Sequence, residues 1–174
     1  MGINVDNICE ELILYGEKDE KTGRWPIYIV VDFDYTLTKE SSWENGTFTA
    51  NDHCFEVLLK WQEKYGAKYI LETMRGPERI QPAIDFCKEN GLEFYGIGRN
   101  PLQDRDGDKT CKAWGVFDID DRNLGAYLVT PDNARPYVDW YSTEKYGDKI
   151  LELIYNRLPE MEEEVLKKKA LLKI

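Results

Sequence analysis

Histidine is almost absent from this sequence of 174 residues: His53 is the only one, which leaves no Ser–His or Cys–His couple to build. The four cysteines lack metal-ligand spacing, so we expect reduced and mostly buried thiols at Cys9, Cys54, Cys87 and Cys111. The absence of a G-x-x-x-x-G-K-[ST] motif disfavours P-loop chemistry. No apolar run reaches the roughly 20 residues of a membrane span. We therefore expect a cytoplasmic protein that does not bind membranes.

Basic residues are outnumbered, with 23 Lys and Arg against 33 Asp and Glu and a formal net charge of −10. This charge disfavours extended binding to a nucleic-acid backbone, although it allows one phosphate to be held locally through a cation. Apolar residues make up 42% of the chain and charged residues 32%, which favours a folded protein. The length suits one domain, which we divide into an N-terminal helical extension (1–25), a core (27–130) and a C-terminal helical segment (131–174).

The apolar pattern of the core predicts alternating strands and helices. The run IYIVVDF at 27–33 is nearly continuous in apolar residues, which is typical of a strand covered on both faces of a parallel sheet. Further strands are predicted at 67–73, 92–98 and 116–121, and helices at 54–65 and 77–90. This order predicts an α/β fold, a Rossmann-like three-layer sandwich with a mainly parallel central sheet. In such a fold the site lies beyond the carboxyl ends of the strands.

Outside the core the pattern is mainly helical. Residues 3–15 predict a short amphipathic helix that Asp6 is able to cap, and Asn51 or Asp52 is able to start the helix at 54–65. A further strand is predicted at 125–129. Two more helices are expected, one that ends before Pro159 and a solvated closing helix at 162–172.

Polar side chains follow the predicted strands at their carboxyl ends. Asp32 and Asp34 follow the first strand, Thr73 ends the second, Lys112 precedes the fourth, and Asp120 and Asp121 end it. Two carboxylates about 4 Å apart repel by roughly 4 kcal/mol at an effective dielectric near 20, so something must offset the repulsion. Either a shared proton or a divalent cation would do so, and all-oxygen ligands favour Mg²⁺ over zinc. Carboxylates, Mg²⁺ and a lysine together are able to move a phosphoryl group.

The ordered residues D-F-D-Y-T at 32–36, Thr73, Lys112 and the pair Asp120 and Asp121 resemble the four motifs of the haloacid-dehalogenase superfamily of phosphohydrolases. The resemblance covers roughly residues 27–125 and extends to a compact bacterial and phage subgroup. It implies a Mg²⁺ cofactor, with Asp32 as nucleophile and Asp34 as acid/base that also ligates the metal through its carbonyl. It further implies that Thr73 and Lys112 hold the phosphoryl group, and that Asp120 ligates Mg²⁺ with Asp121 close by.

The chain departs from the family pattern at two positions, since Tyr35 stands where glycine is common and Asp118 adds a third acid. The intervals from Asp34 to Thr73 and from Thr73 to Lys112 are too short for an inserted cap domain, so we expect an open cleft roofed by the loops at 38–50 and 100–110. Residues near strand ends are candidate substrate contacts: Arg75, Arg99, Asn100 and Arg122, with Trp43 as a stacking surface.

The sequence thus predicts a Mg²⁺-dependent phosphomonoester hydrolase that forms an aspartyl-phosphate on Asp32. The substrate is a phosphorylated small molecule, a nucleotide or a macromolecular phosphate, and a lid lent by a second subunit of a homo-oligomer is one of the alternatives. Two other functions stay open. One is a phospho-accepting signalling switch, although receivers carry their acid, Thr and Lys in a different order. The other is a non-catalytic Mg²⁺-binding interaction module on the same fold.

Overall fold

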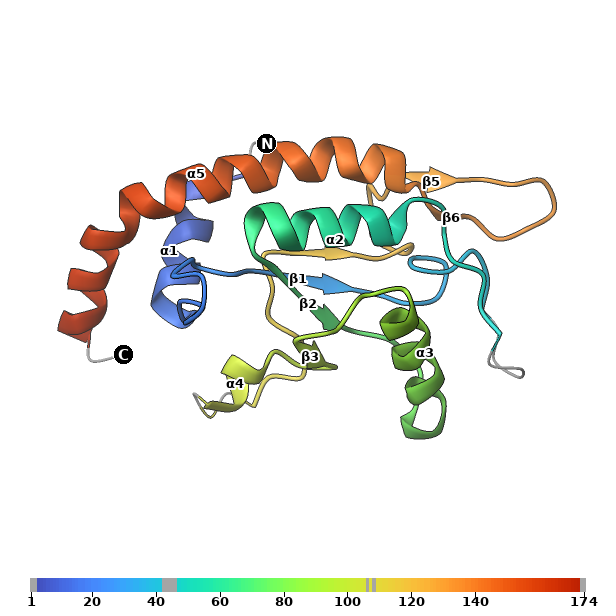
Figure 1. The fold of residues 1–174 in the computed structure, drawn as a ribbon, viewed down its shortest axis with the longest axis horizontal. Helices are drawn as coiled ribbons and strands as arrows, with labels where there is room; N and C mark the ends of the chain where they lie inside the picture. The colour runs from blue at the N-terminus through green and yellow to red at the C-terminus, as the bar shows by residue number, and fades with distance from the viewer. Residues whose placement is uncertain (1–2, 42–46, 106, 108, 173–174) are drawn as a thin grey trace.

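A computed structural model describes residues 3–41, 47–105, 107 and 109–172. Four parallel strands form the central sheet in the order β3-β2-β1-β4: β1 (Ile27–Val31), β2 (Ala67–Leu71), β3 (Gly96–Ile97) and β4 (Phe117–Ile119). Helices α2 (Cys54–Tyr65) and α5 (Trp140–Leu172) lie above the sheet in Figure 1, whereas α3 (Pro77–Glu89) and α4 (Pro101–Arg105) lie below it. This arrangement confirms the predicted α/β fold with three Rossmann-like layers.

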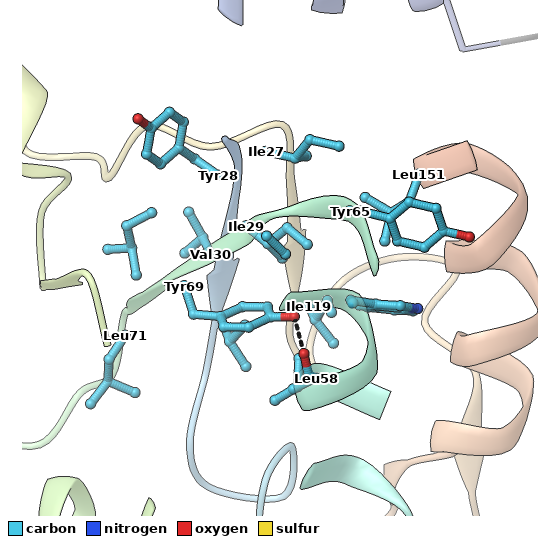
Figure 2. Packing of buried hydrophobic residues seen from close by; sticks show 14 of the residues in the cluster. Ile27, Tyr28, Ile29, Val30, Leu58, Tyr65, Tyr69, Leu71, Ile119 and Leu151 are labelled. Carbon is cyan, nitrogen blue, oxygen red and sulfur yellow. Dashed lines mark hydrogen bonds between the residues drawn. The ribbon is translucent and has the colours of Figure 1, made fainter. Parts of the chain in front are cut away.

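Strand β1 is the centre of the core. Its five residues, IYIVV, are all buried, as expected for a strand with a helix layer on each face. Figure 2 shows the packing around β1, with Leu58 of α2 and Leu151 of α5 on the same side of the sheet. There the hydroxyl of Tyr69 on β2 donates a hydrogen bond of 2.7 Å to the carbonyl of Leu58. A buried polar atom is thus paired, and the tyrosine ring fixes α2 over the sheet.

The register of the sheet sets where the site lies. Val31 at the end of β1 is paired with Leu71 of β2 on one side and with Ile119 of β4 on the other. The ladder continues one residue further, because the amide of Asp32 donates to the carbonyl of Ile119 at 3.0 Å. The residues that follow these three strands therefore leave the sheet at one edge.

Helix α5 corrects the prediction that a helix ends before Pro159. It runs without a break from Trp140 to Leu172, with the proline inside it. A proline inside a helix costs about 3 kcal/mol. Leu158 and Val165, on either side of Pro159, are buried and hold the helix in place. Helix α1 (Val5–Tyr15) lies beside this last helix in Figure 1. The N-terminal extension therefore packs on the C-terminal helix.

Two helix caps also differ from prediction. Asn4, rather than Asp6, caps α1, because its side chain accepts a hydrogen bond of 3.2 Å from the amide of Asn7. Helix α2 begins after His53, which adopts a left-handed backbone (φ 69°) and makes no side-chain cap bond. Neither Asn51 nor Asp52 serves as the cap, and Asn51 is used elsewhere, in the site described below.

Two predicted strands differ from the prediction: one is shorter, and the other lies outside the central sheet. The segment 92–98 contributes only Gly96–Ile97, because the amide of Leu92 is used to close the end of α3 on the carbonyl of Cys87. The segment 125–129 contributes β5 (Leu128–Val129), which pairs with β6 (Tyr137–Val138) in a separate antiparallel hairpin. In the described part of the chain, no helix is both long enough and apolar enough to cross a bilayer.

Gly147 tests the packing between α2 and α5. A Cβ atom at this position would lie 2.3 Å from the ring of Trp61, which is fully buried. Alanine in a helix interior otherwise gains roughly 1 kcal/mol over glycine, but the clash outweighs this gain. We expect Gly147→Ala to lower the free energy of unfolding by about 2 kcal/mol in urea titrations, whereas the exposed Lys145→Ala control changes it by less than about 0.5 kcal/mol. A Gly147→Ala protein as stable as the wild type would contradict this packing.

Candidate active site

The turn that follows β1 is fixed by Thr36, which is fully buried. Its hydroxyl donates to Oδ2 of Asp32 at 3.4 Å and accepts from the amide of Asp121 at 3.2 Å. Its carbonyl accepts from the side-chain amide of Asn51 at 2.9 Å and from the indole of Trp140 at 2.8 Å. One threonine therefore ties the end of β1 to the loop after β4, and both to the helix layer.

Three carboxylates meet at this edge. Asp32, Asp120 and Asp121 each offer one oxygen, and the three oxygens lie within 4.8 Å of one another. The pKa of Asp32 is raised to about 7, mainly by burial and also by the negative charges of the neighbouring acids, against a hydrogen bond from the backbone of Phe33. At an effective dielectric near 20, two charges about 5 Å apart repel by roughly 3 kcal/mol. The cluster is therefore short of positive charge.

This donor set fits Mg²⁺. The ligands are all oxygens, without histidine or thiolate, and Mg²⁺ bonds at about 2.1 Å place two ligands at most about 4.2 Å apart. The observed separation within 4.8 Å therefore needs only small shifts of the side chains to share one ion. Asp32 and Asp120 follow adjacent strands, so the backbone already holds the two carboxylates on one side.

Asp34 faces a different partner. Both of its carboxylate oxygens accept from the guanidinium of Arg75, at 2.9 Å from Nε and 2.5 Å from Nη2. The Arg75 side chain is 2% exposed, and its guanidinium lies 5.0 Å from the ring centroids of both Phe33 and Phe48, which contact each other edge to face. The predicted substrate contact Arg75 is thus a buried partner of the predicted acid/base.

Tyr35 adopts the left-handed backbone conformation that glycine favours (φ 60°). For a residue with a side chain this costs on the order of 1 kcal/mol. Two contacts hold it there: its carbonyl accepts from the amide of Val138 at 2.8 Å, and the guanidinium of Arg135 lies 4.2 Å from its ring. Arg135 also pairs with Asp121, so the hairpin of β5 and β6 is joined to the acidic cluster.

Thr73 and Lys112 are not brought against the three carboxylates. The hydroxyl of Thr73 accepts from the amide of Arg75 at 3.3 Å and so shapes the loop after β2. The ammonium of Lys112 lies 3.2 Å from Asp118, with 75% of its side chain exposed. Among the described residues its ion-pair partner is Asp118, the third acid noted in the sequence, rather than Asp32.

Two further predicted substrate contacts, Arg99 and Asn100, lie in the loop that contains α4, whereas Arg122 follows β4. Arg99 donates to Asp104 at 2.6 Å and to the carbonyl of Thr110. Asn100 is fully buried and donates to the carbonyl of Trp114 at 3.1 Å, so it builds the loop from inside. Trp43 lies outside the described residues.

A pocket of about 280 Å³ opens beside the cluster. Its lining comprises Asp32, Asp34, Tyr35, Ser41, Met74, Asp120, Asp121, Arg122 and Arg135. Four acids and two arginines therefore face one space. Thr73 and Lys112 are not among the described residues that line it.

Sequence reasoning missed three residues of this site. Thr36 ends the D-F-D-Y-T stretch, and its place two residues after Asp34 was the available signal. Glu72 follows β2 as Asp32 follows β1, and burial together with Asp118 and Asp120 raises its pKa. Arg135 carries no local signal, because its partner Tyr35 lies far earlier in the chain.

Comparisons with known proteins agree with the fold. A solved structure of a conserved protein from Bacteroides thetaiotaomicron superimposes with a TM-score of 0.55 and 25% sequence identity, covering 71% of this chain and 91% of that one. No protein-family model and no curated protein match the chain.

The raised pKa of Asp32 makes a prediction for stability. Since the folded state holds this proton up to about pH 7 and the unfolded state only to about pH 4, ionisation destabilises the fold as pH rises through this window. Without metal at pH 8, we expect Asp32→Asn to be more stable than the wild type by on the order of 3 kcal/mol, with the difference shrinking toward pH 4. Mg²⁺ should then raise the melting temperature of the wild type but not that of Asp32→Asn.

The exposed Asp85→Asn variant, on α3, is the matched control and should behave as the wild type in these melting experiments. A wild type more stable than Asp32→Asn at pH 8 without metal would contradict the origin of the shift.

The pair of Arg75 and Asp34 makes a second prediction. Removing one partner leaves a charge with little access to water, so Arg75→Gln should cost about 3 kcal/mol in urea unfolding. The double variant Arg75→Gln with Asp34→Asn should recover much of this loss. The exposed Arg157 and Asp6 have the same two-nitrogen geometry, and Arg157→Gln should have little effect. Additive effects of the two buried substitutions would mean that the pair is not coupled.

Proposed function

We propose that the protein is a Mg²⁺-dependent phosphomonoester hydrolase that works through an aspartyl-phosphate on Asp32. The observation that carries the proposal is the convergence of one oxygen each from Asp32, Asp120 and Asp121 within 4.8 Å, at the carboxyl ends of parallel strands. The ordered motifs that resemble the haloacid-dehalogenase superfamily support it. Mg²⁺, when bound there, would supply positive charge that favours the ionised nucleophile and offsets charge on the phosphoryl group.

In the first step an oxygen of Asp32 attacks the phosphorus, and the bond from phosphorus to the ester oxygen breaks. Thr36 holds Oδ2 of Asp32 through its hydroxyl, which fixes the direction of the carboxylate. Asp34, whose carboxylate pairs with Arg75 in the structure, must first take up a proton from solvent; it then gives this proton to the departing oxygen and so prevents the release of an alkoxide. The products of this step are an alcohol and the aspartyl-phosphate.

In the second step Asp34, now a carboxylate, takes a proton from water, and the water oxygen attacks phosphorus. The bond between phosphorus and Asp32 breaks, so that inorganic phosphate leaves and the starting carboxylate returns. In both steps one carboxylate oxygen of Asp34 must give up its hydrogen bond to Arg75 before it contacts the reacting oxygen. Arg75 is in this proposal a positioning residue, which returns Asp34 to one orientation after each turnover.

The substrate class follows from the openness of the site. Within the described residues, the chain between Asp34 and Thr73 forms the bridge of Thr38 to Ala50, helix α2 and strand β2, without an inserted domain. An uncapped site accepts a phosphorylated small molecule, a nucleotide or a phosphate on a macromolecule. Thr73 and Lys112 keep their proposed roles in phosphoryl binding, although the structure pairs Thr73 with the amide of Arg75 and Lys112 with Asp118.

A second candidate function is a phospho-accepting switch, and the pairing of Asp34 favours it. Both oxygens of the acid/base are bound by Arg75, and without a free acid/base the aspartyl-phosphate would persist. The two functions differ in the lifetime of this intermediate. Turnover within seconds indicates a hydrolase, whereas a phosphoprotein that lasts for many minutes indicates a switch.

We expect purified protein with Mg²⁺ to release phosphate from p-nitrophenyl phosphate, and chelation to stop the reaction. Asp32→Asn should abolish release, because it removes the nucleophile, and Asp34→Asn should lower kcat by about a hundredfold or more. The exposed Asp85→Asn is the matched control and should keep full activity. Equal release by Asp32→Asn and the wild type would reject the mechanism.

A further inference from the structure

The pocket beside the acidic cluster contains positive charge that the proposed chemistry does not use. Among the described lining residues the cations are Arg122 and Arg135, and neither was needed to attack, protonate or hydrolyse. The protein carries a net charge of −10 and four acids line the pocket, so an anionic group is held there only beside these guanidinium groups and a bound cation. Two guanidinium groups in one pocket therefore point to an anion.

Arg135 is held in one orientation before any ligand arrives. Its guanidinium stacks on the ring of Tyr35 at 4.2 Å and pairs with Asp121. Arginine has five N–H donors in a planar fork, so one carboxylate partner leaves donors for a second anion. Because the fork is already ordered, little side-chain entropy is lost when such an anion binds.

Arg122 has weaker partners. Its backbone amide donates to Oδ1 of Asp120 at 2.7 Å, which places the residue directly beside the cluster. Its side chain is exposed and contacts the sulfur of Met74 at 3.6 Å, and sulfur is a weak acceptor. Within the described chain no carboxylate forms an ion pair with it, so its donors are available to a ligand.

The anion is a second group rather than the reacting phosphoryl group. Asp32, which would meet the phosphorus, is half-buried and held by Thr36, whereas Arg122 is exposed at the rim. The pocket, at about 280 Å³, approaches the roughly 300 Å³ of the smallest ligand sites. It has room for more than one phosphoryl group.

We propose that Arg122 and Arg135 bind a second anionic group, phosphate or carboxylate, on the leaving group of the substrate. This inference rests on the proposed hydrolase and narrows its substrates to monoesters that carry two anionic groups. Arg135 supplies a fixed contact, and Arg122 closes on the anion from the rim.

Matched substrate pairs test this proposal. Phosphoglycolate and ethyl phosphate differ by a carboxylate, and 1,3-propanediol bisphosphate and 3-hydroxypropyl phosphate differ by a phosphate. At saturating Mg²⁺ we expect the wild type to favour the doubly anionic member of at least one pair by roughly tenfold in kcat/KM, the size of a charged hydrogen bond. The pair that shows the preference identifies the group as carboxylate or phosphate.

Arg122→Gln and Arg135→Gln should raise KM for the preferred member about tenfold and erase the preference. Arg24→Gln, beyond the opposite ends of the strands, is the matched control and should leave it intact. A wild type without preference, or arginine variants that lower both members of a pair equally, would overturn this proposal alone. If the wild type releases phosphate from p-nitrophenyl phosphate but from no member of either pair, this inference alone is overturned. If it releases phosphate from none of these compounds, the hydrolase proposal fails and this inference falls with it.

Discussion

Repulsion among carboxylates is the constraint around which this molecule is organised. Because β1 and β4 are parallel neighbours with Val31 beside Ile119, the acids that follow them leave the sheet at one edge. The protein holds them there with a single threonine, whose hydroxyl lies between Asp32 and the backbone of Asp121. Protonation of Asp32 and the pairing of Arg135 with Asp121 relieve part of this repulsion, and a bound cation would remove the remaining imbalance of charge.

Three arginines lie near these acids, and each makes a different contact. Arg75, packed against Phe33 and Phe48, fixes Asp34. Arg135 joins Asp121 to the left-handed Tyr35 and so couples the small hairpin to the cluster. Arg122 stands at the rim with its donors turned to a sulfur atom. The ring of Tyr35 contacts Arg135, while the left-handed backbone of Tyr35 is strained.

The sequence was most informative where local pattern and tertiary structure agree. The apolar run of β1 predicted a strand buried on both faces, and the order of strands and helices predicted a parallel sheet with acids at one edge. It was least informative where distant partners decide. Pro159 stays helical because buried neighbours hold α5, Lys112 turns to Asp118 from an irregular loop, and Arg135 meets Tyr35 only in the folded chain. The structure brings Asp120 and Asp121 beside Asp32, but the chemistry assigned to Asp32 stays a prediction.

The contact between the first and last helices has a consequence for synthesis. Helix α1 leaves the ribosome early, yet its apolar face, with Cys9 bonded to the carbonyl of Ile154, has its partner in α5. The sheet is able to assemble while α1 still lacks that cover, and α1 docks only after α5 has been made. During translation this exposed face is therefore the part of the nascent chain that most needs shielding from premature association.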